Sequence, residues 1–348
     1  MSSISGISNG SPAATDMQRL RRAAVHEPFG RIVGKYLFGL SLALVPFGLL
    51  FNDYYSINIL TFVYLMAGLA CAWNIIGGFG GQFSLAHGVF FAAGAYIPAQ
   101  FYLKYGVSPW LTAPAAAAVV ATAAVLISWP TFRLRGPFFA IATMALNEVA
   151  AVLANYSDSL TGGARGLLIP FKAGFSHMIF VERWKYCALM FAFMALTLAV
   201  VVVIRQSRLG YYLLAVREDE DSARASGVNV LAVKLWGMGI SAALTSVGGT
   251  LFAMFIRFLD PPTLLSLPDI GVKFALLSLI GGIGTVWGPV LGAFFIIPAE
   301  NFIRASLGGL PGARLVVLGL LLMLAALFLK KGIVGAAAAL WRRVRATP

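Results

Sequence analysis

The feature that most constrains this chain is a series of apolar blocks, each about 16 to 24 residues long. A helix of about 20 residues, rising 1.5 Å per residue, crosses a hydrocarbon core of roughly 30 Å. Stretches such as LMFAFMALTLAVVVVI do not alternate in polarity, as the strands of a membrane barrel would. Only 11% of the 348 residues are charged, against about 25% in a typical soluble domain. We therefore expect an all-α, polytopic integral membrane protein.

The lengths of the apolar blocks predict about eight full transmembrane helices. They are placed at residues 36–51, 57–76, 83–103, 110–129, 137–155, 185–204, 234–256 and 314–330. With the N-terminus inside, most of the 26 lysines and arginines fall on the cytoplasmic side, as the positive-inside rule requires. We expect a disordered cytoplasmic tail over 1–34, a transmembrane domain over 35–331 and a basic cytoplasmic tail over 332–348.

The segment 271–298 is apolar but too long for one span. It is interrupted by Gly281, Gly282, Gly284, Gly288 and Pro289. A single crossing here would move the basic C-terminal tail to the outside, so a broken or re-entrant segment is predicted. Non-helical backbone at membrane depth survives only where protein or water satisfies its amides. Glycines four residues apart also favour close helix contact, so packing and a transport role both explain the pattern.

The stretch GGFGGQFSLAHG, residues 77–88, combines glycines with Gln82, Ser84 and His87 inside an apolar region. Glycine lets the backbone turn, and polar side chains removed from water need partners. One interpretation is a turn into a broken helix beside a translocation path. The other is a tight turn between spans in which His87 bonds a neighbour, and composition alone favours this second interpretation.

Three polar residues lie in the interior of the predicted span 137–155. Thr143 and Asn147 are four apart and share one helical face, whereas Glu148 lies about 100° further round. A carboxylate at this depth costs roughly 2.5 kcal/mol or more and normally faces the bundle interior. The three residues therefore either line a polar path, with Glu148 contacting a substrate amine, or form interhelical hydrogen bonds. The sequence supports both equally.

The loop 205–234 is the longest polar connection assigned to the cytoplasm. Asp219, Glu220 or Asp221 is suited to begin a short helix, and Gly227 is suited to end it. A charged helix projecting from the membrane fits docking to a soluble partner. A solvated connector would show the same charges.

Several classes of function find no support in the sequence. It has no HExxH, G-x-S-x-G or metal-spaced cluster, and no GxxxxGK[ST] phosphate loop. Cys71 and Cys187 lie in apolar blocks without a metal spacing. The net charge of +13 is distributed at the ends of apolar blocks, which indicates membrane topology and not a nucleic-acid partner. We expect no enzyme activity and no cofactor on this chain, so any ATP that drives it must bind another chain.

Five segments together resemble the permeases of branched-chain amino-acid ABC importers, specifically the LivM-type subunit. They are WNIIGGFGGQFSLAHGVFFAAGAY at 73–96, FRLRGPFFAIATMALNEV at 132–149, DSLTGGARG at 158–166, RLGYYLLAVREDEDSARASGVNV at 208–230 and IGGIGTVWGPVLGA at 280–293. They occur in the family's order, and the resemblance covers about residues 56 to 333.

The resemblance implies roles for two sets of residues. The loop 205–234 is similar to the coupling loop that contacts the ATPase subunits. In it Asp221, Ser222, Ala223 and Gly227 take the marked places of the EAA-x3-G pattern, with Asp and Ser replacing Glu and Ala. The implied coupling residues are Arg217, Glu218, Asp219, Asp221, Ser222 and Gly227. The implied path residues are Gln82, Ser84, His87, Thr143, Asn147 and Glu148.

The resemblance also implies partners and a location. The partners are a second, LivH-type permease, two ATP-binding subunits that hold ATP and Mg²⁺, and a periplasmic solute-binding protein. The location is the bacterial inner membrane, with both termini cytoplasmic. The expected solute is a branched-chain or related amino acid, although similar permeases carry urea, amides, or aromatic or dicarboxylic acids. The rival hypotheses are a self-sufficient secondary transporter or channel with Glu148 as its ion site, and a membrane scaffold.

Overall fold

The computed structural model describes residues 54–134 and 136–306, together with Gly39, Gly319, Met323 and 332–335. The chain divides into two compact units, 1–50 and 51–348, and every element below belongs to the second. Its longer helices are α3 (Tyr54–Asn74), α4 (His87–Tyr105), α5 (Pro109–Thr131), α6 (Pro137–Tyr156), α8 (Arg183–Gln206), α11 (Val230–Ile256), α13 (Val272–Gly282) and α14 (Gly288–Ser306). The shorter helices are α7 (Asp158–Thr161), α9 (Arg208–Glu218), α10 (Glu220–Ala225) and α12 (Pro261–Leu264).

The described helices confirm the predicted all-α class. Six helical stretches in the described part of the chain are long and apolar enough to cross a membrane. Five of them contain the predicted spans 57–76, 110–129, 137–155, 185–204 and 234–256. The predicted span 83–103 corresponds to α4, which begins later, at His87. The predicted spans 36–51 and 314–330 lie outside the described residues, as do the tail 1–34 and most of 332–348.

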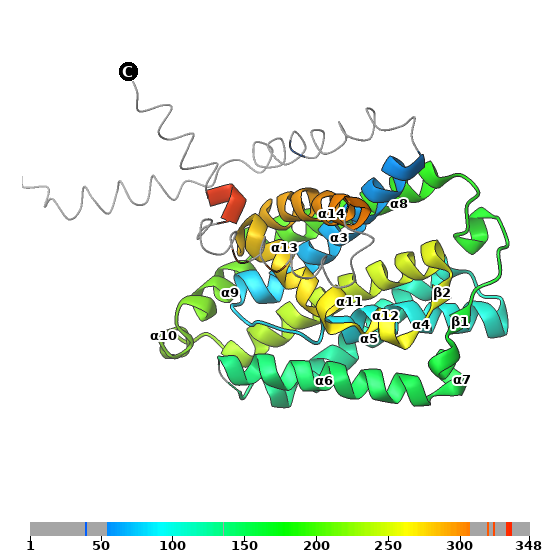
Figure 1. The fold of residues 1–348 in the computed structure, drawn as a ribbon. Helices are drawn as coiled ribbons and strands as arrows, with labels where there is room; N and C mark the ends of the chain where they lie inside the picture. The colour runs from blue at the N-terminus through cyan, green and yellow to red at the C-terminus, as the bar shows by residue number, and fades with distance from the viewer. Residues whose placement is uncertain are drawn as a thin grey trace, which may run out of the picture. The chain divides into compact units, whose positions relative to one another are not determined.

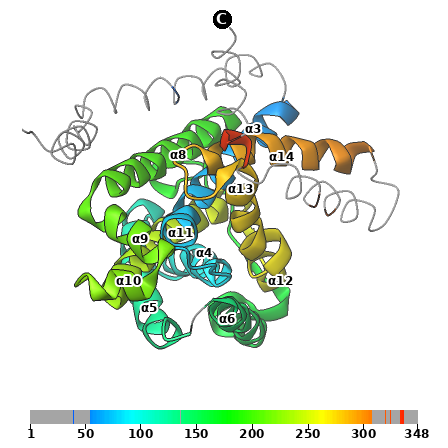
Figure 2. The same ribbon diagram turned by 90° about the vertical axis from the view of Figure 1, so that its left-hand side faces the viewer.

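Helices α3 and α11 form the centre of the packing. Helix α11 packs against α3, α4 and α5, and α3 also contacts α8, α13 and α14 (Figure 2). Small residues allow α4 and α11 to approach closely. A Cβ added to Gly249 would lie 2.1 Å from the Phe91 carbonyl oxygen, and one added to Gly94 would lie 2.2 Å from that of Ser246. Close approach through small residues is the usual basis of helix association in membranes.

The sixth candidate span, Pro261–Gly282, begins the element that the sequence predicts to be broken. Helices α13 and α14 form an antiparallel hairpin around a turn at 283–287. A Cβ on Gly281 would lie 1.6 Å from the Gly288 carbonyl oxygen, and one on Gly292 would lie 1.9 Å from that of Leu277. The glycines therefore both break the helix and pack its two arms. The broken element is longer than the predicted segment 271–298. It extends over 261–306, because helical residues before Val272 and after Pro298 lengthen its two arms.

The two ends of the helices carry different structures. Helices α9 and α10 lie at one end, and the antiparallel pair β1 (Leu167–Leu168) and β2 (Phe258–Leu259) lies at the other, near α7 (Figure 1). The hairpin turn belongs to the end with α9, since Arg205 and Arg217 contact it there. Gly332 returns to this same end, because a Cβ on it would lie 2.4 Å from the Gly282 Cα.

Candidate functional site at the coupling loop and glycine-rich segment

The glycine-rich segment leaves helical geometry without leaving the protein interior. Helix α3 continues as a π-helical turn over Ile75–Phe79, and residues 80–86 are then non-helical up to α4. Protein groups satisfy this backbone: Gln82 N donates to Ile76 O at 3.0 Å, and Trp73 Nε1 donates to Ser84 O at 2.8 Å. The segment is thus a buried, non-helical break between two helices. This geometry fits both a tight turn and the element beside the path that the resemblance implies.

His87 is the first residue of α4 and is fully buried. Its Nε2 lies 2.8 Å from Ser241 Oγ, and its Nδ1 lies 3.1 Å from Ser84 Oγ. Ser241 donates its hydroxyl hydrogen to Ala72 O at 2.6 Å, so it has only acceptor capacity left for His87. We therefore assign the proton to Nε2, with Nδ1 accepting from Ser84. This network joins α3, α4 and α11, as expected of a neutral, interhelical histidine.

Thr143 and Asn147 face inward from α6 and hold two non-helical segments. Thr143 Oγ1 accepts from the Leu85 N–H at 3.1 Å, and Asn147 Nδ2 donates to Leu265 O at 2.9 Å. Asn147 Oδ1 is buried and has no hydrogen-bond donor among the described residues. It lies against Gly88, where a Cβ would come within 2.4 Å of it. Helix α6 therefore supports the buried break at one side and the loop after α12 at the other.

The structure places Glu148 differently from the sequence prediction. An inward orientation was expected, but Glu148 is exposed. It shares the outer surface of α6 with apolar side chains including Ile141, Met144, Val149 and Val152. Thr143 and Asn147 lie on the inward face of the helix. Consecutive side chains on a helix are separated by about 100°, so Glu148 points away from that face. Glu148 therefore lies outside the interior of this chain, and its expected place on the path stays a prediction.

The loop 205–234, named the coupling loop after its expected role, contains two helices, α9 and α10. The predicted ends of the short helix α10 are confirmed. Asp219 Oδ1 accepts from Ser222 N at 2.8 Å, and Gly227 has a φ of +86°, next to a Val228 N–H that bonds Ala223 O at 3.1 Å. These are the expected N-cap and C-terminal glycine geometries. The expected contact residues on this loop are all exposed: Arg217, Glu218, Asp219, Asp221, Ser222 and Gly227.

Glu220 connects α10 to α11 and to the glycine-rich segment. Its Oε1 accepts a hydrogen bond from Lys234 Nζ in α11 and another, at 3.2 Å, from Gln82 Nε2 in the glycine-rich segment. Only 1% of the Lys234 side chain is exposed, compared with 22% for Glu220. The Lys234 ammonium also lies 5.7 Å from the centre of the Phe132 ring. A buried lysine that loses its carboxylate partner destabilises the fold. The contact between Lys234 and Glu220 therefore stabilises the position of the loop.

Further bonds connect the same loop to the hairpin turn. Arg217 Nη1 donates to Gly78 O at 2.8 Å, and Arg205 Nη1 donates to Gly284 O at 3.2 Å. Asn74 completes the link, because its side chain donates to Thr285 O at 2.8 Å and accepts from Gly284 N at 2.9 Å. The coupling loop, the buried break and the hairpin turn therefore form one connected unit.

Sequence reasoning did not identify the anchoring roles of Glu220, Lys234 and Arg205. One signal was available for Lys234, which stands at the beginning of an otherwise apolar span. A lysine there either reaches the interface or needs an acidic partner. The pairing with Glu220 depends on the folding of α10 and was not visible from spacing alone.

The site contains no recognisable catalytic or metal chemistry within the described residues. They hold no group of three or more His, Cys, Asp or Glu residues able to bind a metal ion. Cys71 and Cys187 are free and buried. The described contacts join a peripheral loop to the helix core.

Long apolar helices, a buried break in one of them and a glycine-packed hairpin define the class of a polytopic, multi-pass α-helical membrane protein. Residues 55–326 match the family model described as branched-chain amino acid transport system / permease component. The chain belongs to this family of membrane permeases, which confirms the resemblance seen in its motifs.

Individual relatives agree with this assignment. The chain is 30% identical over 272 residues to the high-affinity branched-chain amino acid transport system permease protein LivM of Escherichia coli, covering 72% of this chain and 63% of that protein. It is 29% identical to LivM of Salmonella typhimurium, covering 79% and 70%. It is also 26% identical to the permease protein LivH of Escherichia coli, covering 77% and 90%. No solved structure matches the chain.

Proposed function

We propose that this chain is a permease subunit of an ATP-driven importer that moves branched-chain or related amino acids from the periplasm to the cytoplasm. Family membership supports the permease role. The observation that carries the coupling to ATP is the contact of Glu220 with both Lys234 and Gln82. Through this contact, an exposed loop is bonded directly to α11 and to the glycine-rich segment.

Family membership supports the proposed partners. Two ATP-binding subunits dock on α9 and α10 and hold ATP with Mg²⁺, so this chain needs no cofactor of its own. A second permease of the LivH type completes the path, and a periplasmic binding protein delivers the solute. The chain lies in the bacterial inner membrane with α9, α10 and both termini in the cytoplasm. Its similarity to both LivM and LivH proteins is compatible with a paired, related permease.

The proposed mechanism uses the connected unit at the coupling loop. A displacement of α10 by the ATPase moves Glu220, and with it Lys234 in α11 and Gln82 in the buried break. Arg217, at the end of α9, extends the same route, because it donates to Gly78 O and lies against Gly284. Glycine backbone accepts such changes in φ and ψ at little cost. ATP binding drives transport only if the ATPase interacts differently with two states of the permease.

Reconstitution tests this proposal. The chain, its second permease, the ATPases and the binding protein are reconstituted in vesicles, and uptake of radiolabelled leucine is measured with each component omitted in turn. We expect uptake to require ATP and every component. Uptake by this chain alone that follows the proton gradient would instead identify a secondary transporter, and unchanged uptake after its omission would identify a scaffold.

A further inference from the structure

Helix α6 is the least enclosed of the candidate membrane spans in the described part of the chain. Only 17% of the residues in its most apolar stretch are buried, compared with 39% to 89% in the other five. It contacts α4, α5 and α12, and Figure 2 shows it at the edge of the helices. The rest of its surface therefore faces either lipid or another chain.

The exposed surface of α6 carries a row of residues at alternating spacings of three and four. We call this row the α6 seam; its members are Phe138, Ile141, Ala145, Glu148 and Val152. Two helices that pack side by side meet along rows with this spacing, and a small residue such as Ala145 lets their backbones approach closely. An apolar row of this kind also suits lipid, so the choice between lipid and protein depends on Glu148.

Glu148 lies near the middle of the membrane span. It follows Pro137, the first of the 20 residues of α6, by about 16 Å in a helix about 30 Å long. An ionisable side chain at this depth is costly in hydrocarbon, and such residues normally face protein or water. The middle of the α6 seam is therefore unsuited to lipid.

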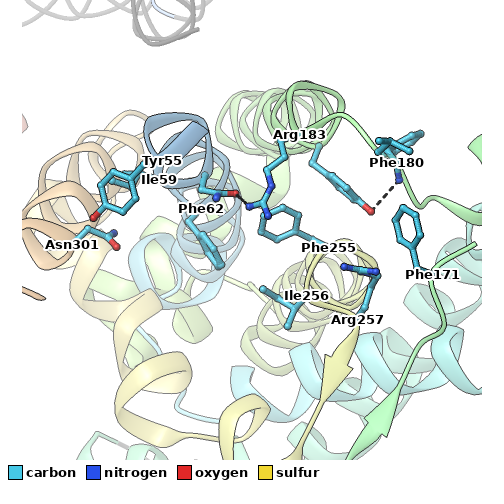
Figure 3. Close-up of a pocket in the computed structure, with 13 residues that line it drawn as sticks. Tyr55, Ile59, Phe62, Phe171, Phe180, Arg183, Phe255, Ile256, Arg257 and Asn301 are labelled. Carbon is cyan, nitrogen blue, oxygen red and sulfur yellow. Dashed lines mark hydrogen bonds between the residues drawn. The ribbon is translucent and has the colours of Figure 1, made fainter. Parts of the chain in front are cut away.

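Other charged side chains of the described spans have partners within this chain. Lys234 bonds the Glu220 carboxylate, and Lys273 pairs with a glutamate of α14 at 3.1 Å. At the start of α8, Arg183 donates to Asn58 Oδ1 (Figure 3). The carboxylate of the α6 seam, in contrast, has no hydrogen bond or ion pair with any described residue. Its polar surroundings must therefore come from outside the described part of the chain.

The outer face of α8 provides a contrast to the α6 seam. Between the two ends of this helix, the exposed residues are Ala188, Ala192, Leu196, Ala199 and Val203, all of them apolar. Lipid tails are as apolar as such side chains, so this face needs no protein partner. The two faces differ in the acid that only the α6 seam carries.

A related permease chain is the partner that best fits the seam. The chain is similar to both LivM and LivH proteins, so a LivH-type partner has a related sequence over much of its length. Related chains can pack through the same surface on each, as in a two-fold interface. A second polytopic chain also supplies the protein or enclosed water that a carboxylate at this depth needs.

We propose that the second permease packs on the α6 seam and that Glu148 lies between the two chains. The proposal deepens the proposed function and rests on it for the identity of the partner. Water and polar groups enclosed by the two chains then surround the carboxylate. A path shared by both chains also reconciles the expected path position of Glu148 with its outward orientation.

Photocrosslinking in the assembled importer tests this surface. The probe is p-benzoylphenylalanine, which attaches to nearby C–H groups on irradiation. It replaces Val152 in the seam or, as the matched control, Leu196 on the outer face of α8; both are exposed apolar residues. We expect an adduct with the second permease from Val152 and none from Leu196. An adduct from Leu196 alone, or one between two copies of this chain at Val152, would overturn the proposal.

Two tryptophan variants provide a second measurement. Val152→Trp adds bulk to the α6 seam, and Leu196→Trp adds the same bulk to the outer face of α8. We expect Val152→Trp to enter the membrane but to lose copurification of the second permease, whereas Leu196→Trp should keep it, because lipid adapts to the larger side chain. Equal copurification in the two variants would contradict packing at the seam.

Failure of this inference can be distinguished from failure of the proposed function. If the unsubstituted chain lacks ATP-dependent leucine uptake or does not copurify with a second permease, the proposed function fails. If uptake and copurification are normal but the probe at Val152 forms no adduct with the second permease, only the assignment of the α6 seam fails.

Discussion

At the scale of single residues, neighbouring polar side chains have very different surroundings. His87 has hydrogen-bond partners on both ring nitrogens and is fully buried, so its environment is that of an interhelical connector. Asn147 lies inward on α6, and Glu148, the next residue, lies outward. A carboxylate on an otherwise apolar outer surface at membrane depth is unfavourable in lipid. A role at a protein or aqueous surface accounts for its position.

Glu148→Ala tests that role. We expect uptake to fall while the complex still assembles and its Tm changes by little, because no described side chain is bonded to Glu148. Val152→Ala, on the same exposed face of α6, serves as the control and should leave uptake near the unsubstituted level. Poor membrane insertion or a lowered Tm in Glu148→Ala would show that the carboxylate supports the fold instead.

At the scale of elements, the short helix α10 has an exposed side and an anchored side. Asp219, Asp221 and Ser222 are exposed, whereas Glu220 reaches Lys234 and Gln82. The exposed side is available to a partner, and the anchored side transmits its movement. The arrangement depends on helical spacing, which separates consecutive side chains by about 100°.

Variants of the two sides of α10 should therefore fail in different ways. Lys234→Met removes the charged partner of the Glu220 carboxylate and leaves it the Gln82 amide. We expect a loss of stability toward the lower end of about 3–5 kcal/mol, since Glu220 is partly exposed. The double variant Glu220→Leu with Lys234→Met should recover part of that loss, as measured by thermal unfolding.

The exposed variants provide the contrast. Asp221→Ala and Gly227→Ala should keep the protein inserted but weaken assembly with the ATPase or uncouple ATP hydrolysis from uptake. Gly227→Ala should also destabilise α10 by about 1 kcal/mol, because of its positive φ. Normal coupled uptake in both would remove the coupling role from this loop.

At the scale of the whole molecule, one end of the helices carries α9, α10 and the hairpin turn, and the other carries β1 and β2. A cavity lined by residues that include Arg183 and Arg257 lies at this second end. The proposed importer needs these ends on opposite sides of the membrane. Both native cysteines are buried, so single introduced cysteines can report on each side without removing them.

Labelling with a membrane-impermeant thiol reagent checks this orientation. Ser226→Cys, next to the exposed end of α10, should react only from the cytoplasmic side. Ser176→Cys, in the exposed loop before α8, should react only from the periplasmic side. Labelling of Ser226→Cys from the periplasm would invert the topology and rule out contact with cytoplasmic ATPases.

The sequence by itself determined the helical class, five of the spans, the break near Gly284 and the two ends of α10. Each of these follows from local properties: apolar length, glycine conformation and side-chain capping. Only the tertiary structure decided that Glu148 faces outward, that Glu220 pairs with Lys234, and that Arg183 and Arg257 share a cavity. These are contacts between distant segments, and the rotation and packing of each helix depend on partners that no local pattern specifies.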